Sequence, residues 1–306
     1  MNYNGLNISP ELRHCKQDLL TMYRNSVLSA AAKIRSATTE KNKAKVVNNV
    51  VNTVKDNLRS KITEQALGEE WNKQDLLETI LMVEYSSFVV MLEERNKVWP
   101  YDYMAFSRRI GEMWEPFCKL CFVFPINELS LYDPPEFEDV KAALISEIAE
   151  YISSLGITEE EKTQVSNYFS QVWDLVTSGE IQLKSDLHFQ KDGHKYVVDF
   201  KSGFGSNEKG NTNRLLMVGK IYQEMEEEYD CRLFVRANDN NHYLETLRNS
   251  GVWSVTTGED TYAKIREYSG YDISRWIHAN INWMEDFSAE MSDHIRNNGL
   301  ETYLVW

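Results

Sequence analysis

The chain of 306 residues is long enough for two domains, or for one domain with a large addition. Hydrophobic residues make up 42% of it and charged residues 26%, proportions that exclude a disordered or fibrous protein. The formal net charge of −14 argues against nucleic-acid binding through overall charge, although a local basic surface would be sufficient for it.

The N-terminal residues and the cysteines both lead us to expect a cytoplasmic protein. Residues 1–17 lack the basic and then apolar order of a secretory signal. The most apolar stretch, residues 79–92, is short and contains Glu84, so it predicts a buried helix rather than a membrane span. Four cysteines in a chain of this size do not form a disulfide framework, and a reducing compartment suits them.

Helical spacing of apolar residues extends from residue 10 to about residue 128. Within it, residues 33–61 carry eight Lys or Arg against two acids, the one clearly basic stretch of the chain. This stretch is either a solvated helix face or a surface that contacts phosphates. In the second case Lys41, Lys43 and Lys45 would be its contact residues.

An aromatic-rich segment, residues 99–125, predicts the core of this helical region. Its Cys118 and Cys121 have the spacing of half a zinc site, but no second pair follows, which favours two packed thiols. Turn-forming residues gather at 130–139. We therefore expect a helical region over residues 1–135, acting as a DNA clamp or in dimerisation, and a second domain over residues 136–306.

The second half alternates between helical and strand periodicity. A helix is expected over 140–156, and Thr158 with Glu161 forms a capping box that opens another. Further elements follow in the order strand 181–190, strand 195–201, helix 214–229, strand 231–237, helix 241–249 and strand 252–257, before more helices. This order predicts an α/β or α+β core, with a mixed central sheet flanked by helices.

The sequence Asp192-Gly193 between two alternating runs is a strong signal for a tight β-hairpin. A two-residue type I′ turn there pairs apolar residues with apolar residues along one face. The same register sets Asp186 opposite Asp199 on the other face. A turn of three or more residues would destroy this facing.

Two opposed carboxylates repel each other unless something positive lies between them. Such an oxygen-rich pair, with Cβ atoms about 5 Å apart, suits Mg²⁺. Lys201 points to the same side, where its ammonium could orient a water or stabilise charge on a phosphate. His188 shares this face, and a lone histidine on a strand is more often structural.

Asp186, followed by Asp199-Phe200-Lys201, resembles the motif of the PD-(D/E)xK nuclease superfamily. In that family an aspartate on one strand and an acid-x-lysine on the next form the metal site. A helix precedes the family's hairpin, and a helix and a strand follow it. The resemblance covers about residues 140–257 and implies a restriction-endonuclease-like core. Family members often add a glutamate from the preceding helix, for which Glu147 is our choice, whereas Ser185 replaces a frequent proline.

Within that superfamily the chain looks most like a type II restriction endonuclease. The resemblance implies a Mg²⁺-dependent, sequence-specific enzyme that cleaves double-stranded DNA, acts as a homodimer, pairs functionally with a DNA methyltransferase and has no membrane partner. Residues 202–214 form either a polar connection or a DNA-contacting loop. The contacts in the second case would come from Lys209, Asn211, Asn213 and Arg214.

Three alternatives remain open at the level of sequence. The first is a repair, phage-defence or structure-specific nuclease of the same superfamily. The second is a retaining glycosidase, because such enzymes also use paired carboxylates about 5 Å apart. The third is a helical interaction protein in which the hairpin has no catalytic role.

Overall fold

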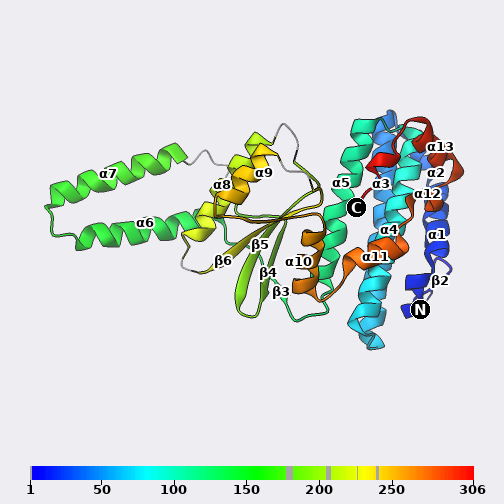
Figure 1. Cartoon of the computed structure of the whole chain (residues 1–306), viewed down its shortest axis with the longest axis horizontal. Coiled ribbons are helices and arrows are strands. Elements are labelled where there is room, and N and C mark those ends of the chain that lie inside the picture. The colour runs from blue at the N-terminus through cyan, green and yellow to red at the C-terminus, as the bar shows by residue number, and fades with distance from the viewer. Residues whose placement is uncertain (1, 177–181, 205–207, 226, 239–240) are drawn as a thin grey trace.

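The computed structural model describes residues 2–176, 182–204, 208–225, 227–238 and 241–306. Figure 1 shows three parts in a row: a bundle of helices, a central sheet with helices on its faces, and a helical hairpin that projects from the far side of the sheet. Both ends of the chain lie in the bundle (Figure 1).

The bundle is built around a helix whose central residues are enclosed on all sides. Its elements are β1 (Asn2–Tyr3), β2 (Leu6–Asn7), η1 (Pro10–His14), α1 (Lys16–Ser29), α2 (Ala31–Ser36), α3 (Glu40–Gly68), α4 (Lys73–Val98) and α5 (Tyr103–Val123). Every residue from 79 to 93 in α4 is buried, as expected for a helix that is apolar on all sides. The two buried acids of α4 are neutralised, because Lys55 contacts Glu84 at 2.8 Å and Arg24 contacts Glu93 at 2.7 Å.

Within the described residues, the central sheet has five strands in the order β3-β4-β5-β6-β7. These are β3 (Ser130–Leu131), β4 (Leu187–Lys191), β5 (His194–Lys201), β6 (Tyr229–Val235) and β7 (Ser254–Thr257). The pairs β3/β4 and β4/β5 are antiparallel, whereas β5/β6 and β6/β7 are parallel. The parallel strands are joined through α8 (Lys209–Gln223) and α9 (His242–Asn249). The predicted mixed sheet flanked by helices is thus confirmed.

Each face of the sheet packs on a different hydrophobic core. Phe189, Phe200 and Phe234 point into the large core that the sheet shares with the bundle. Val197 and Leu233 point the other way, into a smaller core with residues of α8 and α9. The large core also includes the C-terminal elements, which return the chain to the bundle. They are α10 (Glu259–Ser269), α11 (Ile273–Asn280), α12 (Trp283–Asp286), α13 (Ala289–Asn297) and η2 (Glu301–Tyr303).

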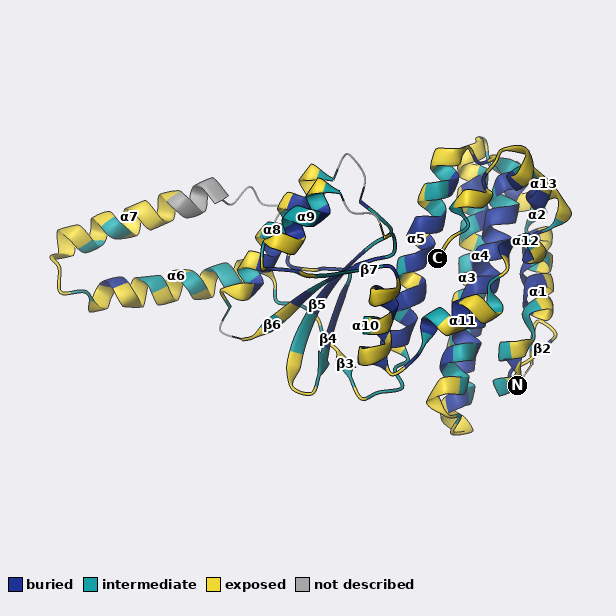
Figure 2. Ribbon diagram, in the orientation of Figure 1, coloured by how far each residue is buried: buried dark blue, intermediate teal, exposed yellow. Residues whose placement is uncertain are grey.

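The helical hairpin consists of α6 (Phe137–Ser154) and α7 (Glu159–Val176), inserted between β3 and β4. The predicted capping box starts α7, because the Thr158 N–H donates to Oε2 of Glu161 at 2.9 Å and the Glu161 N–H donates to Thr158 Oγ1 at 3.3 Å. Figure 2 shows that both helices are mostly exposed.

Three element boundaries differ from those expected. The first strand of the hairpin begins at Leu187, because the chain bends at Asp186; of the expected range 181–190, residue 181 lies outside the described residues. Helix α8 begins at Lys209. The second part of the segment 202–214, which was expected to contact DNA, therefore forms the first turns of a helix. This helix also ends early, at Gln223, before the acids Glu224, Glu227 and Glu228, whose like charges at helical spacing would repel one another.

Candidate functional site

The β4–β5 hairpin has the predicted turn and the predicted register. Asp192 and Gly193 have φ angles of 52° and 83°, the positive values that a type I′ turn requires. Leu187 pairs with Val198 in the ladder, and every pair between there and the turn follows the same register. The ladder ends at the Leu187–Val198 pair, and the next residues along the two strands are Asp186, at a bend, and Asp199.

Asp199 is a fully buried carboxylate held between two cations. Nζ of Lys201 donates to its Oδ1, and Nη2 of Arg214 donates to its Oδ2 at 2.8 Å. Nζ of Lys201 also donates to the Phe200 carbonyl at 3.1 Å. A charge in this position must be paired, because burial removes its hydration. Arg214 reaches the carboxylate from α8, so two separate elements hold Asp199.

Asp186 lies at the bend just before β4 and is tied across the hairpin. Its Oδ2 accepts a hydrogen bond from the N–H of Phe200 at 2.7 Å. Burial, followed by the negative charge of Asp199, raises the pKa of Asp186 above its usual value. The two aspartates therefore repel each other in the folded chain, and a bound cation would relieve that repulsion.

A third carboxylate comes from the bundle. The charge of Glu115 on α5 contributes to the raised pKa of Asp186, after the larger effects of burial and Asp199. Glu115 also forms an ion pair with Lys119 at 2.5 Å. The sequence reasoning missed Glu115, although its signal was present: it and Lys119 are the only charged residues of the otherwise apolar segment 113–122.

Helix α5 approaches this end of β5 very closely. A Cβ atom on Gly111 would lie 2.7 Å from Oγ of Ser202, the residue that follows Lys201. Trp114 packs edge-on against Phe200, with ring centroids 5.7 Å apart. Glu115 follows Gly111 by one helical turn and therefore lies on the same side of α5, toward the hairpin.

His188 supports the bend that carries Asp186. Its Nε2 accepts a hydrogen bond from the N–H of Ser185 at 2.9 Å, and the rings of Tyr132 and Tyr222 lie beside it. Burial, and then the charge of Lys184, lowers the pKa of His188 to about 4. The imidazole is therefore neutral at pH 7, and its position is that of a structural residue.

Several predicted site residues lie elsewhere. Glu147 is exposed on α6, on the hairpin that projects from the sheet (Figures 1 and 2). Lys41, Lys43 and Lys45 belong to α3, from which the sheet is separated by α5 (Figure 1). The structure thus brings neither the preferred glutamate nor the basic stretch to the aspartate pair.

The remaining predicted residues lie at the start of α8. Arg214 reaches Asp199, as described above, whereas Lys209 and Asn213 are exposed. Asn211 is half-buried and donates to Oε2 of Glu208 at 3.0 Å. Residues 205–207 of the predicted DNA-contacting segment lie outside the described residues.

Charges of both signs surround the aspartate pair. Lys201 and Arg214 contact Asp199, while Lys119 and Lys184 both act on the pKa of nearby His188. Among the described residues, no three or more His, Cys, Asp or Glu side chains form a ready-made metal cluster. Asp133 acts on the pKa of His188 in the opposite sense, so the site is a carboxylate pair with two further acids nearby and a similar number of cations.

Comparison with known proteins identifies no relative of this chain. No protein-family model matches the chain, no curated protein is significantly similar to it, and no solved structure matches it. Within the described residues, no helix has both the length and the apolar character needed to cross a membrane.

Proposed function

We propose that the chain is a Mg²⁺-dependent DNA endonuclease whose site contains Asp186, Asp199 and Lys201, with Glu115 as a third acid. The observation that carries this proposal is the pair of mutually repelling aspartates, one of them buried and directly contacted by Lys201. The arrangement resembles the PD-(D/E)xK motif in its strand positions, and a helix and a parallel strand follow the hairpin as in that family.

The residues of the site fit a magnesium ion. Mg²⁺ prefers carboxylate oxygens and usually keeps several waters, so two or three acids are sufficient to hold it. A carboxylate offers about four lone-pair positions, and the two cations on Asp199 leave positions free for a metal. Asp186 and Asp199 would hold the ion, with Glu115 acting directly or through a water.

Each residue then has a distinct role in hydrolysis. Bound Mg²⁺ would supply stabilisation of the charge that develops on the phosphate. Lys201 would orient the attacking water in line with the departing 3′ oxygen. Arg214, 40% exposed at its side chain, reaches both Asp199 and solvent and would bind a phosphate oxygen. Lys119 and Lys184 would add attraction for the DNA backbone in an otherwise acidic protein.

The contacts of Asp199 favour phosphate chemistry over the glycosidase alternative. The glycosidase alternative gives no role to Lys201, which contacts Asp199, whereas hydrolysis of a phosphodiester uses a cation at this position to stabilise charge. A type II restriction enzyme remains our specific proposal within the nuclease class, together with the homodimer and the partner methyltransferase that the resemblance implies.

The test is digestion of purified phage DNA with the protein and Mg²⁺. We expect cleavage that EDTA abolishes and that Asp199→Asn lowers by at least about 100-fold. Asp192→Asn is the matched control, because Asp192 lies in the turn of the same hairpin and should leave cleavage unchanged. Sequencing of the ends decides the subclass: one repeated end sequence supports restriction, while cutting at flaps or junctions supports a structure-specific nuclease. Undigested DNA under all these conditions would refute the nuclease proposal.

A further inference from the structure

The α6–α7 hairpin exposes large apolar side chains at a higher density than the rest of the described chain. Of residues 137–171, whose burial the structure describes, only Phe137 and Ile152 are buried. The hairpin projects from the sheet and can be approached from several sides (Figures 1 and 2). Exposed apolar side chains gathered in this way mark a surface that binds another molecule. This short stretch contains five of the fourteen exposed large hydrophobic residues: Ile145, Tyr151, Ile157, Tyr168 and Phe169.

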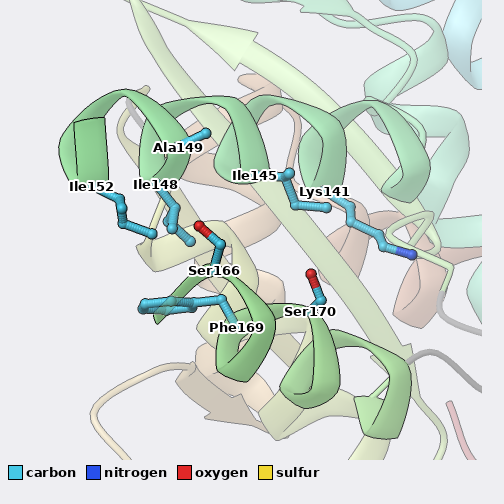
Figure 3. A pocket seen from close by; sticks show the side chains of 8 residues that line it. All are labelled: Lys141, Ile145, Ile148, Ala149, Ile152, Ser166, Phe169 and Ser170. Carbon is cyan, nitrogen blue, oxygen red and sulfur yellow. The ribbon is translucent and has the colours of Figure 1, made fainter. Parts of the chain in front are cut away.

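The two helices form an apolar groove on one side of the hairpin. Figure 3 shows the isoleucines of α6 facing Phe169 of α7 across this groove. It encloses a hollow of about 270 Å³. Ile145 and Phe169 line it and remain 42% and 43% exposed, so the apolar lining is open to a ligand. Its other lining residues are Lys141, Ile148, Ala149, Ile152, Ser166 and Ser170.

The spacing of the lining residues favours a helix as the occupant. On α6 they lie at positions 141, 145, 148, 149 and 152, which keeps them on one face of the helix over about 16 Å. On α7 they lie at 166, 169 and 170, with the same spacing of three and four residues. A groove between two packed helices accepts the side chains of a third helix, which buries its own apolar stripe there. A helix of about three turns covers the length of this groove.

The charge of the hairpin favours a basic occupant. Residues 137–171 carry seven acids, all of them exposed, and only two lysines. Each lysine is already paired with an acid: Lys141 with Glu138 at 3.8 Å, and Lys162 with Glu159 at 2.9 Å. The net charge of this stretch is therefore −5, and a positively charged ligand is attracted to it.

An acid lies at each end of the groove. Glu138 precedes Ile145 by seven residues, about two helical turns, so it lies on the same face of α6 toward the base of the hairpin. Glu159 precedes Ser166 by the same seven residues on α7, at the tip. Nucleic acids and anionic lipid surfaces are repelled by this face, and a second hairpin of this chain would bring the same excess of acids.

We propose that the groove binds a basic amphipathic helix of another protein. The apolar stripe of that helix contacts Ile145 and Phe169, while its lysines or arginines face the acids of the hairpin. The apolar contact supplies affinity, and the charges supply the preference for basic over acidic helices. The hairpin is then a binding arm of the protein. This inference does not depend on nuclease activity at the aspartate pair.

The experiment measures the binding of fluorescein-labelled peptides to the full chain by fluorescence anisotropy. The first peptide is about 18 residues long, with leucine along one helical face and lysine at every other position. The second peptide has glutamate in place of lysine, and the third has serine in place of leucine. We expect the first peptide to bind and the second not to bind. The third should bind at least about tenfold more weakly, because it buries no apolar stripe.

Substitutions in the groove test where the first peptide binds. Ile145→Ser and Phe169→Ser should each weaken its binding by about fivefold or more, without any change in net charge. The matched controls Tyr151→Ser and Tyr168→Ser remove exposed aromatic side chains that do not line the groove, and should leave the affinity unchanged. All four positions are exposed, so each variant should keep the circular dichroism spectrum of the wild type.

A second pair of variants tests the charge of the groove. Glu138→Gln/Glu159→Gln should weaken the first peptide at least about threefold at low salt, and less at high salt, because salt screens exposed charges. Glu40→Gln/Glu64→Gln is the control, since it removes the same charge from exposed positions of α3 in the bundle. The control should leave the affinity nearly unchanged.

Several results would overturn the proposal. One is the absence of binding of the first peptide at up to about 100 µM chain, because the proposal requires only basic charge and an apolar stripe. Equal affinity for the first and third peptides would assign the attraction to net charge alone. Equal losses in the groove variants and their controls would place the peptide elsewhere. In sedimentation without peptide, a dimer that Phe169→Ser dissociates would assign the groove to a second copy of the chain instead.

Discussion

Lys201 and Lys195 lie on the same strand, yet only Lys201 contacts a buried acid. Lys195 instead pairs with Glu227 near the other end of β5. This pair of lysines allows the proposed catalytic role of Lys201 to be separated from a general effect of charge. Lys201→Ala should lower the rate of DNA cleavage by about 100-fold or more, the usual effect of removing a group that positions a reacting molecule.

The measurement is single-turnover cleavage at saturating Mg²⁺, with Lys195→Ala as the control. Binding of DNA to Lys201→Ala should persist, because Arg214 and the nearby lysines remain. Cleavage by Lys201→Ala at the rate of Lys195→Ala would contradict the proposed mechanism.

Asp186 provides a test of metal binding that does not depend on activity. The pKa of Asp186 is raised in the folded chain, so folding favours the protonated carboxyl. The stability that the protonated form contributes is complete below the unfolded pKa and is lost as the pH rises through the folded pKa. Asp186→Asn keeps an acceptor for the Phe200 N–H and removes the repulsion from Asp199. We expect the melting temperature at pH 7 to rise by about 2 °C or more.

Mg²⁺ should raise the melting temperature of the wild type, because an ion that binds only the folded chain stabilises it. The same Mg²⁺ concentration should have a smaller effect on Asp186→Asn, and the usual effect on the turn variant Asp192→Asn. Equal shifts in all three proteins would show that the metal does not bind the aspartate pair.

His188 predicts a loss of stability in mild acid. Its folded pKa of about 4 lies below the unfolded value of about 6.5, so the neutral form is favoured by folding. The stabilisation is complete above pH 6.5 and is lost as the pH falls toward 4, at up to about 1.4 kcal/mol per pH unit. The physical reason is that a protonated Nε2 could no longer accept the N–H of Ser185.

Urea denaturation at pH 7, 6 and 5 measures how the free energy of unfolding changes with pH. His188→Gln retains a side-chain acceptor but does not titrate. The free energy of unfolding of this variant should therefore fall less steeply with decreasing pH, by the equivalent of about one proton taken up on unfolding. The control is His194→Gln, since His194 lies exposed on the neighbouring strand. An unchanged slope in His188→Gln would mean that other groups cause the acid sensitivity.

At the scale of elements, the close contact between α5 and the end of β5 sets how near Glu115 lies to the aspartate pair. Gly111→Ala places a methyl group against both Oγ and Cβ of Ser202, at 2.7 and 2.9 Å in the present geometry. We expect a loss of about 1–3 kcal/mol in the free energy of unfolding. Cleavage should fall as well, because the helix that carries Glu115 is displaced.

The double variant Gly111→Ala/Ser202→Gly should recover most of both losses, because it removes the opposing side chain. Gly210→Ala is the control: a Cβ there meets no atom within 4 Å, and the residue lies in α8. Chemical denaturation and cleavage rates measure both effects. Without recovery in the double variant, the close approach of α5 would not be the cause.

The contact between α5 and the end of β5 shows why one part of the site could be predicted from the sequence and another could not. The register of Asp186 and Asp199 is local information, fixed by Asp192-Gly193 and by the alternation of apolar residues beside it. Glu115 is brought near Asp186 by the packing of Gly111 against Ser202, a residue 91 positions later, and no local pattern reports such a contact.

The position of Glu147, exposed on α6, could not be predicted for a related reason. Its helix does precede the hairpin along the chain, and proximity in sequence was the only guide available. The structure inserts that helix between two neighbouring strands and directs it away from the sheet. The fold class was predictable because a mixed sheet follows from the order of elements, whereas the placement of an insertion depends on tertiary packing.

At the scale of the whole molecule, one large core joins the bundle, one face of the sheet and the C-terminal helices. Trp306, for example, donates to the Ile110 carbonyl at 3.1 Å and packs against Phe117, with ring centroids 5.0 Å apart. We therefore expect the bundle and the sheet to unfold in one transition.

Thermal melts followed by far-UV and near-UV circular dichroism measure this, because backbone and aromatic signals should coincide. The domain division expected at residue 135 predicts two transitions instead. Trp306→Ala should lower the melting temperature of the single transition without splitting it. Separate midpoints for the two signals would favour independent domains.

The ladder between β3 and β4 joins two strands that are separated by the whole α6–α7 hairpin: Leu131 pairs with Phe189. The ends of the insertion meet at adjacent strands. Because the entropy of closing a connection grows only slowly with its length, the sheet can form with connections of different lengths between β3 and β4. The tip at residues 155–158 is thus a natural position for a fluorophore or an affinity tag. Such a label would report on the helical hairpin and leave the strands beside Asp186 and Asp199 unaltered.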